Sequence, residues 1–345
     1  MKNYFGVLVL LLFLVYSCDK VKQSDDLVAV GVEKTFLTFD EVEAYEAALA
    51  DKEKAVLQIQ QSPTFSSFQQ KFKSYEEDEL LEVEGLEDYV AEDRILHLLN
   101  EYQTIQLGDW ICQLDFRSKT VYVLHESQWE EVQNNQLNTV PAVQNFSFEE
   151  EVASYIEIAM EDGVELQEAK ELFLAAGSAT QTAARAVCPG VDSKKKEKEK
   201  CGDLQYTSGV DSKTYSAKVK LVYQKAGIYF SVKAQVKNYR TWVGCNLNTT
   251  GLQFIEYGEV TINKRKTRRR GLSRYCVDDF TGGQFAFTVQ REGGAYDVDG
   301  SRAILRNKLY EGTKGLQDLY VAANFVWGSH SGGVNAHQIL FIIEK

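Results

Sequence analysis

The chain has 345 residues, of which 44% are hydrophobic and 26% are charged, and its formal net charge is −12. This composition excludes a wholly disordered or collagen-like chain and indicates a globular protein. The length favours two domains. The 24 glycines follow no fixed period, which argues against an internal repeat.

The N-terminus predicts export. Lys2 supplies a positive charge, and an almost unbroken apolar run follows from Phe5 to Tyr16. A helix of this length spans about 18 Å, which is short of a hydrocarbon core of about 30 Å. The pattern therefore predicts a secretory signal peptide over residues 1–17 and argues against a membrane-spanning helix.

A small residue precedes a cysteine where the apolar run ends, in the sequence Val15-Tyr16-Ser17-Cys18-Asp19. This pattern resembles the lipobox of bacterial lipoproteins. The resemblance implies that Cys18 carries acyl chains such as palmitate and becomes the N-terminus of the mature chain. Two or more acyl chains anchor a protein stably to a bilayer. Residues 18–35 are then the lipidated cysteine and a polar tether, and the alternative is an ordinary signal peptide with a chance cysteine.

Charge divides the rest of the chain into two halves. Residues 19–187 carry 12 Lys and Arg against 35 Asp and Glu, whereas residues 188–345 carry 25 against 15. The hydrophobic period changes at the same place. This predicts an acidic, mainly helical region over residues 36–187 and a basic β domain over residues 188–345, with a boundary near Cys188.

The acidic half predicts helices around a small β-hairpin. Thr38 and Glu41 form a capping-box pattern before apolar residues at helical spacing that continue to Ile59. Further helices are expected over residues 88–100, 147–160 and 164–176, and Ser147 with Glu150 forms a second capping-box pattern that opens the helix 147–160. The hairpin is expected from residues 104–114 and 120–124. An aromatic stripe lies between the first two helices and predicts a buried helix face: Phe65, Phe68, Phe72 and Tyr75.

The basic half predicts antiparallel strands. Apolar residues alternate with Lys and polar residues over residues 217–223 and 228–236, which predicts one face in a core and lysines in water. Five further strands are expected over residues 254–262, 284–290, 302–305, 319–327 and 339–343. Seven strands without intervening helices indicate an α+β chain whose C-terminal domain is an antiparallel sandwich or barrel-like domain.

Two stretches resemble uncharacterised Bacteroidota envelope lipoproteins, a family of the domain-of-unknown-function kind. The first is residues 98–101 with 105–109, Leu-Leu-Asn-Glu and Ile-Gln-Leu-Gly-Asp. The second is residues 229–237, Tyr-Phe-Ser-Val-Lys-Ala-Gln-Val-Lys, before Trp242-Val243-Gly244. The resemblance implies an envelope location and a helical region before a β domain. It implies no activity and no catalytic residues.

The remaining five cysteines permit disulfides in an oxidising compartment. Cys188 and Cys201 bracket a polar, lysine-rich segment and are the first candidate pair, and Cys245 with Cys276 is the second. Cys112 is expected to stay free and buried in the hairpin. No Cys-x-x-Cys spacing exists, so no metal site is expected, and no cofactor is indicated.

The most concentrated charge is a candidate binding site for anions, formed by Lys264, Arg265, Lys266, Arg268, Arg269 and Arg270. Behind a secretion signal, its partners would be an acidic glycan, lipid headgroups or a protein, including the acidic half of this chain, and not nucleic acid. A solvated loop between strands is the simpler interpretation. Aromatic residues expected on the surface among basic residues would also suit acidic sugars: Tyr229, Tyr239, Trp242, Tyr257 and Tyr275.

The sequence therefore predicts a lipid-anchored outer-membrane protein, on the periplasmic or surface face, with a binding or structural role. The alternative is an envelope hydrolase that uses His330 or His337 with Asp297 or Asp299. The simpler interpretation of the segment between His330 and His337 is a solvated hairpin loop.

Overall fold

The computed structural model describes residues 33–77, 85–86, 89, 92–178, 194–199, 205–207, 214–241, 247–248, 252–270, 273–281, 287–291, 304–328 and 334–343. Contacts divide the chain into Met1–Glu33 and one compact unit, Lys34–Lys345, which contains every described helix and strand. The predicted boundary near Cys188 lies outside the described residues.

The acidic half contains six α-helices among its described residues, together with a five-stranded sheet. Its helices are α2 (Val42–Ala50), α3 (Lys52–Gln60), α4 (Phe68–Glu77), α5 (Arg94–Leu98), α6 (Val152–Asp162) and α7 (Leu166–Ser178). Two short 3-10 helices, η2 (Glu126–Glu131) and η3 (Leu137–Thr139), follow the sheet's fourth strand. The helical character of this half is as the hydrophobic periodicity predicts.

The local details of these helices differ from the prediction in four places. The helix expected from residue 147 begins at Val152, and Ser147 lies in a strand, Gln144–Ser147. The expected first helix is split at Asp51, whose carboxylate accepts the backbone N–H of Glu53 and so begins α3. The capping box at Thr38 is wrong, because Thr38 lies in a strand and α2 begins after Glu41 with no side-chain cap. Within the described part of the expected helix 88–100, the helical residues are those of α5.

The predicted buried aromatic face is confirmed at Phe68 and Phe72, which lie in α4 and are fully buried in the core of the acidic half. Phe65 precedes the helix and packs, partly buried, against the same core. The remaining residue, Tyr75, also lies in α4, but only its backbone is described.

The predicted hairpin is part of a larger sheet. Its strands, in the order in which they pair, are β1 (Thr38–Phe39), β2 (Thr104–Leu107), β3 (Trp110–Asp115), β4 (Thr120–His125) and β5 (Gln144–Ser147). A turn at Gly108, with φ of 54°, splits the first expected strand into β2 and β3. The short β1 pairs in parallel with β2, and the other neighbours are antiparallel.

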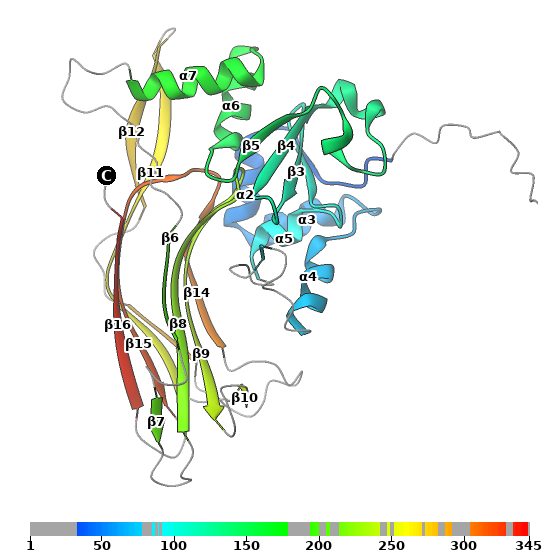
Figure 1. Cartoon of the computed structure of the whole chain (residues 1–345). Helices are drawn as coiled ribbons and strands as arrows, with labels where there is room; N and C mark the ends of the chain where they lie inside the picture. Colours follow the sequence, from blue (N-terminus) through cyan, green and yellow to red (C-terminus); the bar gives the residue numbers. More distant parts are fainter. Residues whose placement is uncertain are drawn as a thin grey trace, which may run out of the picture. The chain divides into compact units, whose positions relative to one another are not determined.

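The basic half forms two further antiparallel sheets (Figure 1). The first contains β6 (Lys194–Glu199), β7 (Gln205–Thr207), β8 (Thr214–Lys225), β9 (Phe230–Thr241), β10 (Leu247–Asn248) and β14 (Ile304–Gly312). The second contains β11 (Leu252–Arg270), β12 (Ser273–Thr281), β13 (Phe287–Arg291), β15 (Leu316–Gly328) and β16 (Val334–Ile343). Among the described strands, neither sheet closes into a barrel.

Side chains of β8, β9, β11 and β15 share one buried apolar cluster, to which both sheets contribute. The other face of β8 and β9 is also covered where its side chains are described, since Lys220 and Lys233 are 9% and 6% exposed. The prediction that the alternating lysines face water is therefore wrong at these two residues. The alternation of apolar and charged residues correctly predicted the strands, but it did not show that the charged face of the sheet is buried as well.

The turn between β8 and β9 belongs to the core of the acidic half. Ala226, Ile228 and Tyr229 are fully buried there among side chains of that half. Gly227 sits at the turn with φ of 69°, and its N–H donates to the carbonyl of Phe148 at 3.0 Å. The two halves of opposite charge are thus joined by a shared core as well as by the chain.

Candidate functional site

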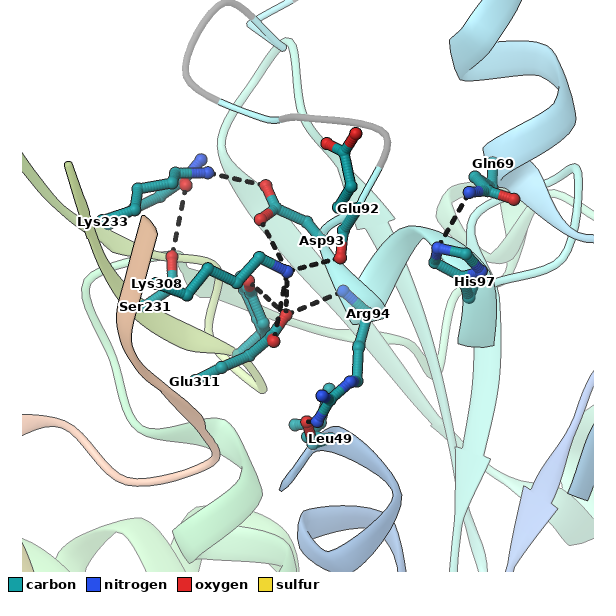
Figure 2. Close-up of polar contacts among 12 residues, drawn as sticks. Leu49, Gln69, Glu92, Asp93, Arg94, His97, Ser231, Lys233, Lys308 and Glu311 are labelled. Carbon is teal, nitrogen blue, oxygen red and sulfur yellow. Dashed lines mark hydrogen bonds and ion pairs between the residues drawn. The ribbon is translucent and has the colours of Figure 1, made fainter. Parts of the chain in front are cut away.

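Four charged side chains meet where the acidic half contacts strands β9 and β14. They are Asp93, Lys233, Lys308 and Glu311, here called the charge cluster. Lys233 Nζ donates to Asp93 Oδ2 at 2.6 Å, and Lys308 Nζ lies 3.2 Å from Asp93 Oδ1. Lys308 Nζ also lies 3.1 and 3.2 Å from the two Glu311 oxygens. Figure 2 shows Lys308 between the two carboxylates.

A β-bulge brings the two residues of β14 to the same face of the sheet. Side chains three apart on a regular strand point to opposite faces. The register with β9 shifts between Lys308 and Tyr310, so Lys308 lies opposite Lys233 and Glu311 opposite Ser231. An extra residue in a strand reverses the alternation beyond it. Leu309 and Tyr310 consequently both pack against the apolar cluster between the sheets, while Lys308 and Glu311 face Asp93.

Asp93 directly precedes α5, and that short helix is linked to β14. The N–H of Arg94 donates to Glu311 Oε1 at 2.7 Å, which satisfies a donor that the helix itself cannot pair. The Arg94 guanidinium donates to the carbonyl of Leu49 in α2. Tyr229 completes the surroundings, because its hydroxyl donates to the same Glu311 oxygen at 2.8 Å.

The charge cluster is largely closed to water. The side chains of Asp93, Lys233 and Glu311 are 0%, 7% and 7% exposed, and that of Lys308 is 24% exposed. The ring of Tyr89 lies 5.3 Å from Lys233 Nζ, in cation-π contact. Two ammonium groups balance two carboxylates, so the cluster is neutral as a whole. Removing one partner from such an arrangement is strongly destabilising, because it leaves an unpaired charge in a medium that solvates it poorly.

Two more ion pairs join the halves, one at the end of β8 and one just after β14. Lys225 Nζ at the end of β8 lies 3.0 Å from Glu149. Lys314, in the turn between β14 and β15, pairs with Glu157 of α6. Burial lowers the pKa of Lys314, but the charge and hydrogen bond of Glu157, together with Glu46 and Glu151, outweigh it and raise the pKa above its usual value.

Because three tyrosines are buried, we expect the free energy of unfolding to fall at alkaline pH. Burial is the main cause that raises the pKa values of Tyr45, Tyr229 and Tyr310 well above the ordinary value, and the charges of Asp93 and Glu311 add to it at Tyr229. Tyrosines of the unfolded chain ionise near pH 10. The stability that these groups contribute is complete below about pH 10 and is lost as the pH rises further, by about 1.4 kcal/mol per pH unit for each group.

We therefore expect the tyrosinate absorbance of these residues to appear together with loss of far-UV circular dichroism during a titration upward from about pH 8. Tyr229→Phe should flatten the decline in the free energy of unfolding above about pH 10. An unchanged decline in that variant would contradict the placement of Tyr229 in the charge cluster's surroundings.

The predicted basic site is not a loop. Lys264–Arg270 forms the second part of β11, paired with β12. Lys264 Nζ lies 5.8 Å from the ring of Tyr310, and only the backbone of residues 265–270 is described. Among the described side chains, Lys225, Lys233, Lys308 and Lys314 form ion pairs with carboxylates of the acidic half.

Several other predicted residues fall outside the described part of the chain: Cys18, Cys188, Cys201, Cys245, Trp242, Asp297, Asp299 and His330. Backbone alone is described for Cys276 in β12, His337 in β16, Tyr239 in β9, Tyr257 in β11 and Tyr275 in β12. His337 lies opposite Phe325 of β15. Tyr229 was expected on the surface and is fully buried instead, because the turn that precedes it enters the core of the acidic half.

Cys112 is a free, fully buried thiol in β3, as expected. Burial raises the pKa of its thiol, which keeps it protonated and unreactive. Within the described ranges, no three His, Cys, Asp or Glu side chains gather as metal ligands would. No described helix is long and apolar enough to cross a bilayer.

The charge cluster was not predicted from the sequence. Lys233 stands in a strand whose alternation resembles that of a solvated face, and Asp93 lies about 140 residues earlier in the chain, as the sequence separation of the pair shows. The one available signal was the excess of opposite charge on the two halves. That signal indicated attraction between the halves without naming the residues.

Comparison with known proteins adds one structural neighbour. No protein-family model matches the chain, and no curated protein matches it. A solved structure of a DUF4848 family protein from Bacteroides thetaiotaomicron is 11% identical, with 89% of this chain and 97% of that chain covered and a TM-score of 0.18. A TM-score of this size does not establish a shared fold.

Proposed function

We propose that this chain is an exported lipoprotein of the cell envelope, anchored to the outer membrane through Cys18. The observation that carries the proposal is the short apolar run from Phe5 to Tyr16, which ends at a small residue followed by a cysteine. An oxidising compartment would also permit the disulfides Cys188–Cys201 and Cys245–Cys276.

Its role would be binding or structural. The charge cluster supports a structural role, since it pairs each of its carboxylates with a lysine and joins the acidic half to β9 and β14. The C-terminal half would be a sandwich of its two sheets. The buried apolar cluster shared by β8, β9, β11 and β15 supports that architecture.

The basic end of β11 would bind an anionic partner. Pairing of β11 with β15 ends at Lys264, so that among the described strands residues 265–270 pair with β12 alone. The register places Lys264 opposite Asp279 and Arg265 opposite Asp278. From Lys266 to Arg270 the residues opposite are Val277, Cys276, Tyr275, Arg274 and Ser273, none of them acidic. Across the ribbon, the register therefore gives these residues no acidic neighbour, and this concentration of positive charge would suit lipid headgroups or acidic glycans.

Replacing Cys18 by alanine tests the anchor. We expect the variant to leave the membrane fraction and to accumulate as an exported protein without acyl chains, because the lipid attachment is lost while the signal peptide is kept. Fractionation with immunoblotting measures the result. Cys112→Ala, at a buried thiol in β3, is the matched control and should remain with membranes. Tight membrane association of the Cys18 variant would count against lipid anchoring.

Binding to anionic vesicles and to a sulfated glycan tests the basic ribbon. We expect Arg268→Gln/Arg269→Gln/Arg270→Gln to weaken binding at low salt, and the unchanged chain to lose affinity as the Debye length falls from about 10 Å to about 3 Å. Lys52→Gln/Lys54→Gln is the control, since both lysines are exposed on α3 at a distance in the sequence from the ribbon. Salt-independent binding, or equal loss in both variants, would exclude the ribbon as the site.

A further inference from the structure

The charge cluster holds an amine, a carboxyl group and a possible proton acceptor within ion-pair distance of one another, away from bulk water. Lys308 Nζ lies 3.2 Å from Asp93 Oδ1 and within 3.2 Å of both oxygens of Glu311. Lys233 Nζ holds the other Asp93 oxygen at 2.6 Å. We propose that Asp93 and Lys308 become joined by an intramolecular isopeptide bond, with Glu311 as the proton acceptor and Lys233 as the group that stabilises the carboxyl oxygen.

Proximity and burial both favour this reaction. Groups held in contact react far faster than the same groups in free solution, since their translational freedom is already lost. Asp93 is fully buried, and the cluster holds two positive and two negative charges away from water. Amide formation removes one charge of each sign from this poorly solvating medium. The four charges become two, and Lys233 and Glu311 remain to balance each other.

The reaction needs no further reagent. The Lys308 ammonium passes one proton to Glu311, and the free electron pair on Nζ forms a bond to Cγ of Asp93. The negative charge that develops on Oδ2 faces the ammonium of Lys233. The bond between Cγ and Oδ2 then breaks. Oδ2 leaves as water with the proton from Glu311 and a second proton from the attacking nitrogen, so that an ammonium and a carboxylate give an amide and one water.

Glu311 selects Lys308 over Lys233 as the nucleophile. Both lysines contact Asp93, but Glu311 lies beside Lys308 and hence can accept its proton. Glu311 itself is positioned by the hydroxyl of Tyr229 and the N–H of Arg94, which both donate to Oε1. Its second oxygen, Oε2, remains in contact with Lys308 at 3.2 Å. The β-bulge in β14 places acceptor and nucleophile on one face, as the reaction needs.

Such a bond would tie the segment before α5 to β14 and close a long loop in the unfolded chain. It would join the acidic and basic halves covalently in a compartment where a surface protein meets proteases and detergents. Unlike a disulfide, it would withstand reducing agents.

Mass spectrometry of the purified full-length chain tests the proposal. We expect the folded protein to be lighter than its sequence, after its N-terminal processing is assigned, by the mass of one water molecule. Tryptic digestion should yield one linked species that joins residues 74–94 to residues 307–314. Lys308→Arg keeps the positive charge but lacks the amine, and Glu311→Gln lacks the proton acceptor, so both should give separate peptides. Lys54→Arg, at an exposed lysine, should keep the linked species.

Three results would overturn the proposal. The first is recovery of residues 74–94 and the peptides around Lys308 unlinked from the folded, unmodified chain. The second is a link from residues 74–94 to residues 226–237, which would make Lys233 the nucleophile. The third is an undiminished link in Glu311→Gln. Circular dichroism shows whether Lys308→Arg is folded, and the first two results need no variant.

Discussion

Asp93→Ala is expected to lower the free energy of unfolding by about 3 to 5 kcal/mol. Asp93 is fully buried and contacts two lysines, Lys233 at 2.6 Å and Lys308 at 3.2 Å. The substitution removes the carboxylate but leaves both ammonium groups in place, and a buried charge without its partner is strongly destabilising. Urea unfolding followed by circular dichroism measures the change, provided that the slope with denaturant is unaltered.

Lys34→Ala is the matched control for that prediction. Lys34 pairs with Glu126 at 3.3 Å, and both side chains are 40% exposed. Water and salt screen such a pair, so its loss should cost only about 0 to 1 kcal/mol. A result in which the two substitutions have the same small effect would show that Asp93 is solvated, and that the charge cluster does not hold the halves together.

Gly227→Ala should be strongly destabilising for two reasons that add. With φ of 69°, Gly227 adopts a left-handed conformation, which costs a residue with a Cβ about 1 to 2 kcal/mol. An added Cβ would also lie 2.4 Å from Val121 Cγ2 and 3.3 Å from Val152 Cγ2, both in the core of the acidic half. Overpacking of a filled core typically costs a further 1 to 3 kcal/mol, approximately.

The control for Gly227 is Gly163→Ala. Gly163 ends α6 with φ of 64°, but nothing lies within 4 Å of the position of its added Cβ. That substitution should therefore cost only the backbone contribution, about 1 to 2 kcal/mol. Val121→Ala introduced with Gly227→Ala should recover part of the loss, because the clashing methyl group is removed. Equal losses for the two glycine variants would contradict insertion of the β8–β9 turn into the core of the acidic half.

The sequence predicts the strands well where alternation is long. Residues 217–223 were expected as a strand and lie in β8, and most of the expected strand 228–236 lies in β9, which begins at Phe230. The alternation failed to show what covers the second face, because a lysine paired with a distant buried carboxylate looks the same in sequence as a lysine in water. Lys233 is the example, since its partner Asp93 lies in the other half of the chain.

Two highly charged segments were not predicted to be strands. Lys194–Glu199 was interpreted as a polar segment between two cysteines and forms β6, paired with β8. Lys264–Arg270 was interpreted as a solvated loop and extends β11. Both lack the apolar alternation that marks a strand, and their backbone pairing comes from a neighbouring strand rather than from their own residues. The bulge at Lys308 likewise depends on tertiary packing, so the charge cluster could not be assembled from sequence alone.

The most direct test of the proposed function is mass spectrometry of the N-terminal peptide of the protein purified from membranes. The proposal predicts a chain that begins at Cys18, with acyl chains on that residue. An intact N-terminus at Met1 without an acyl group would contradict export and anchoring together, and would leave the envelope partners of the basic ribbon without support.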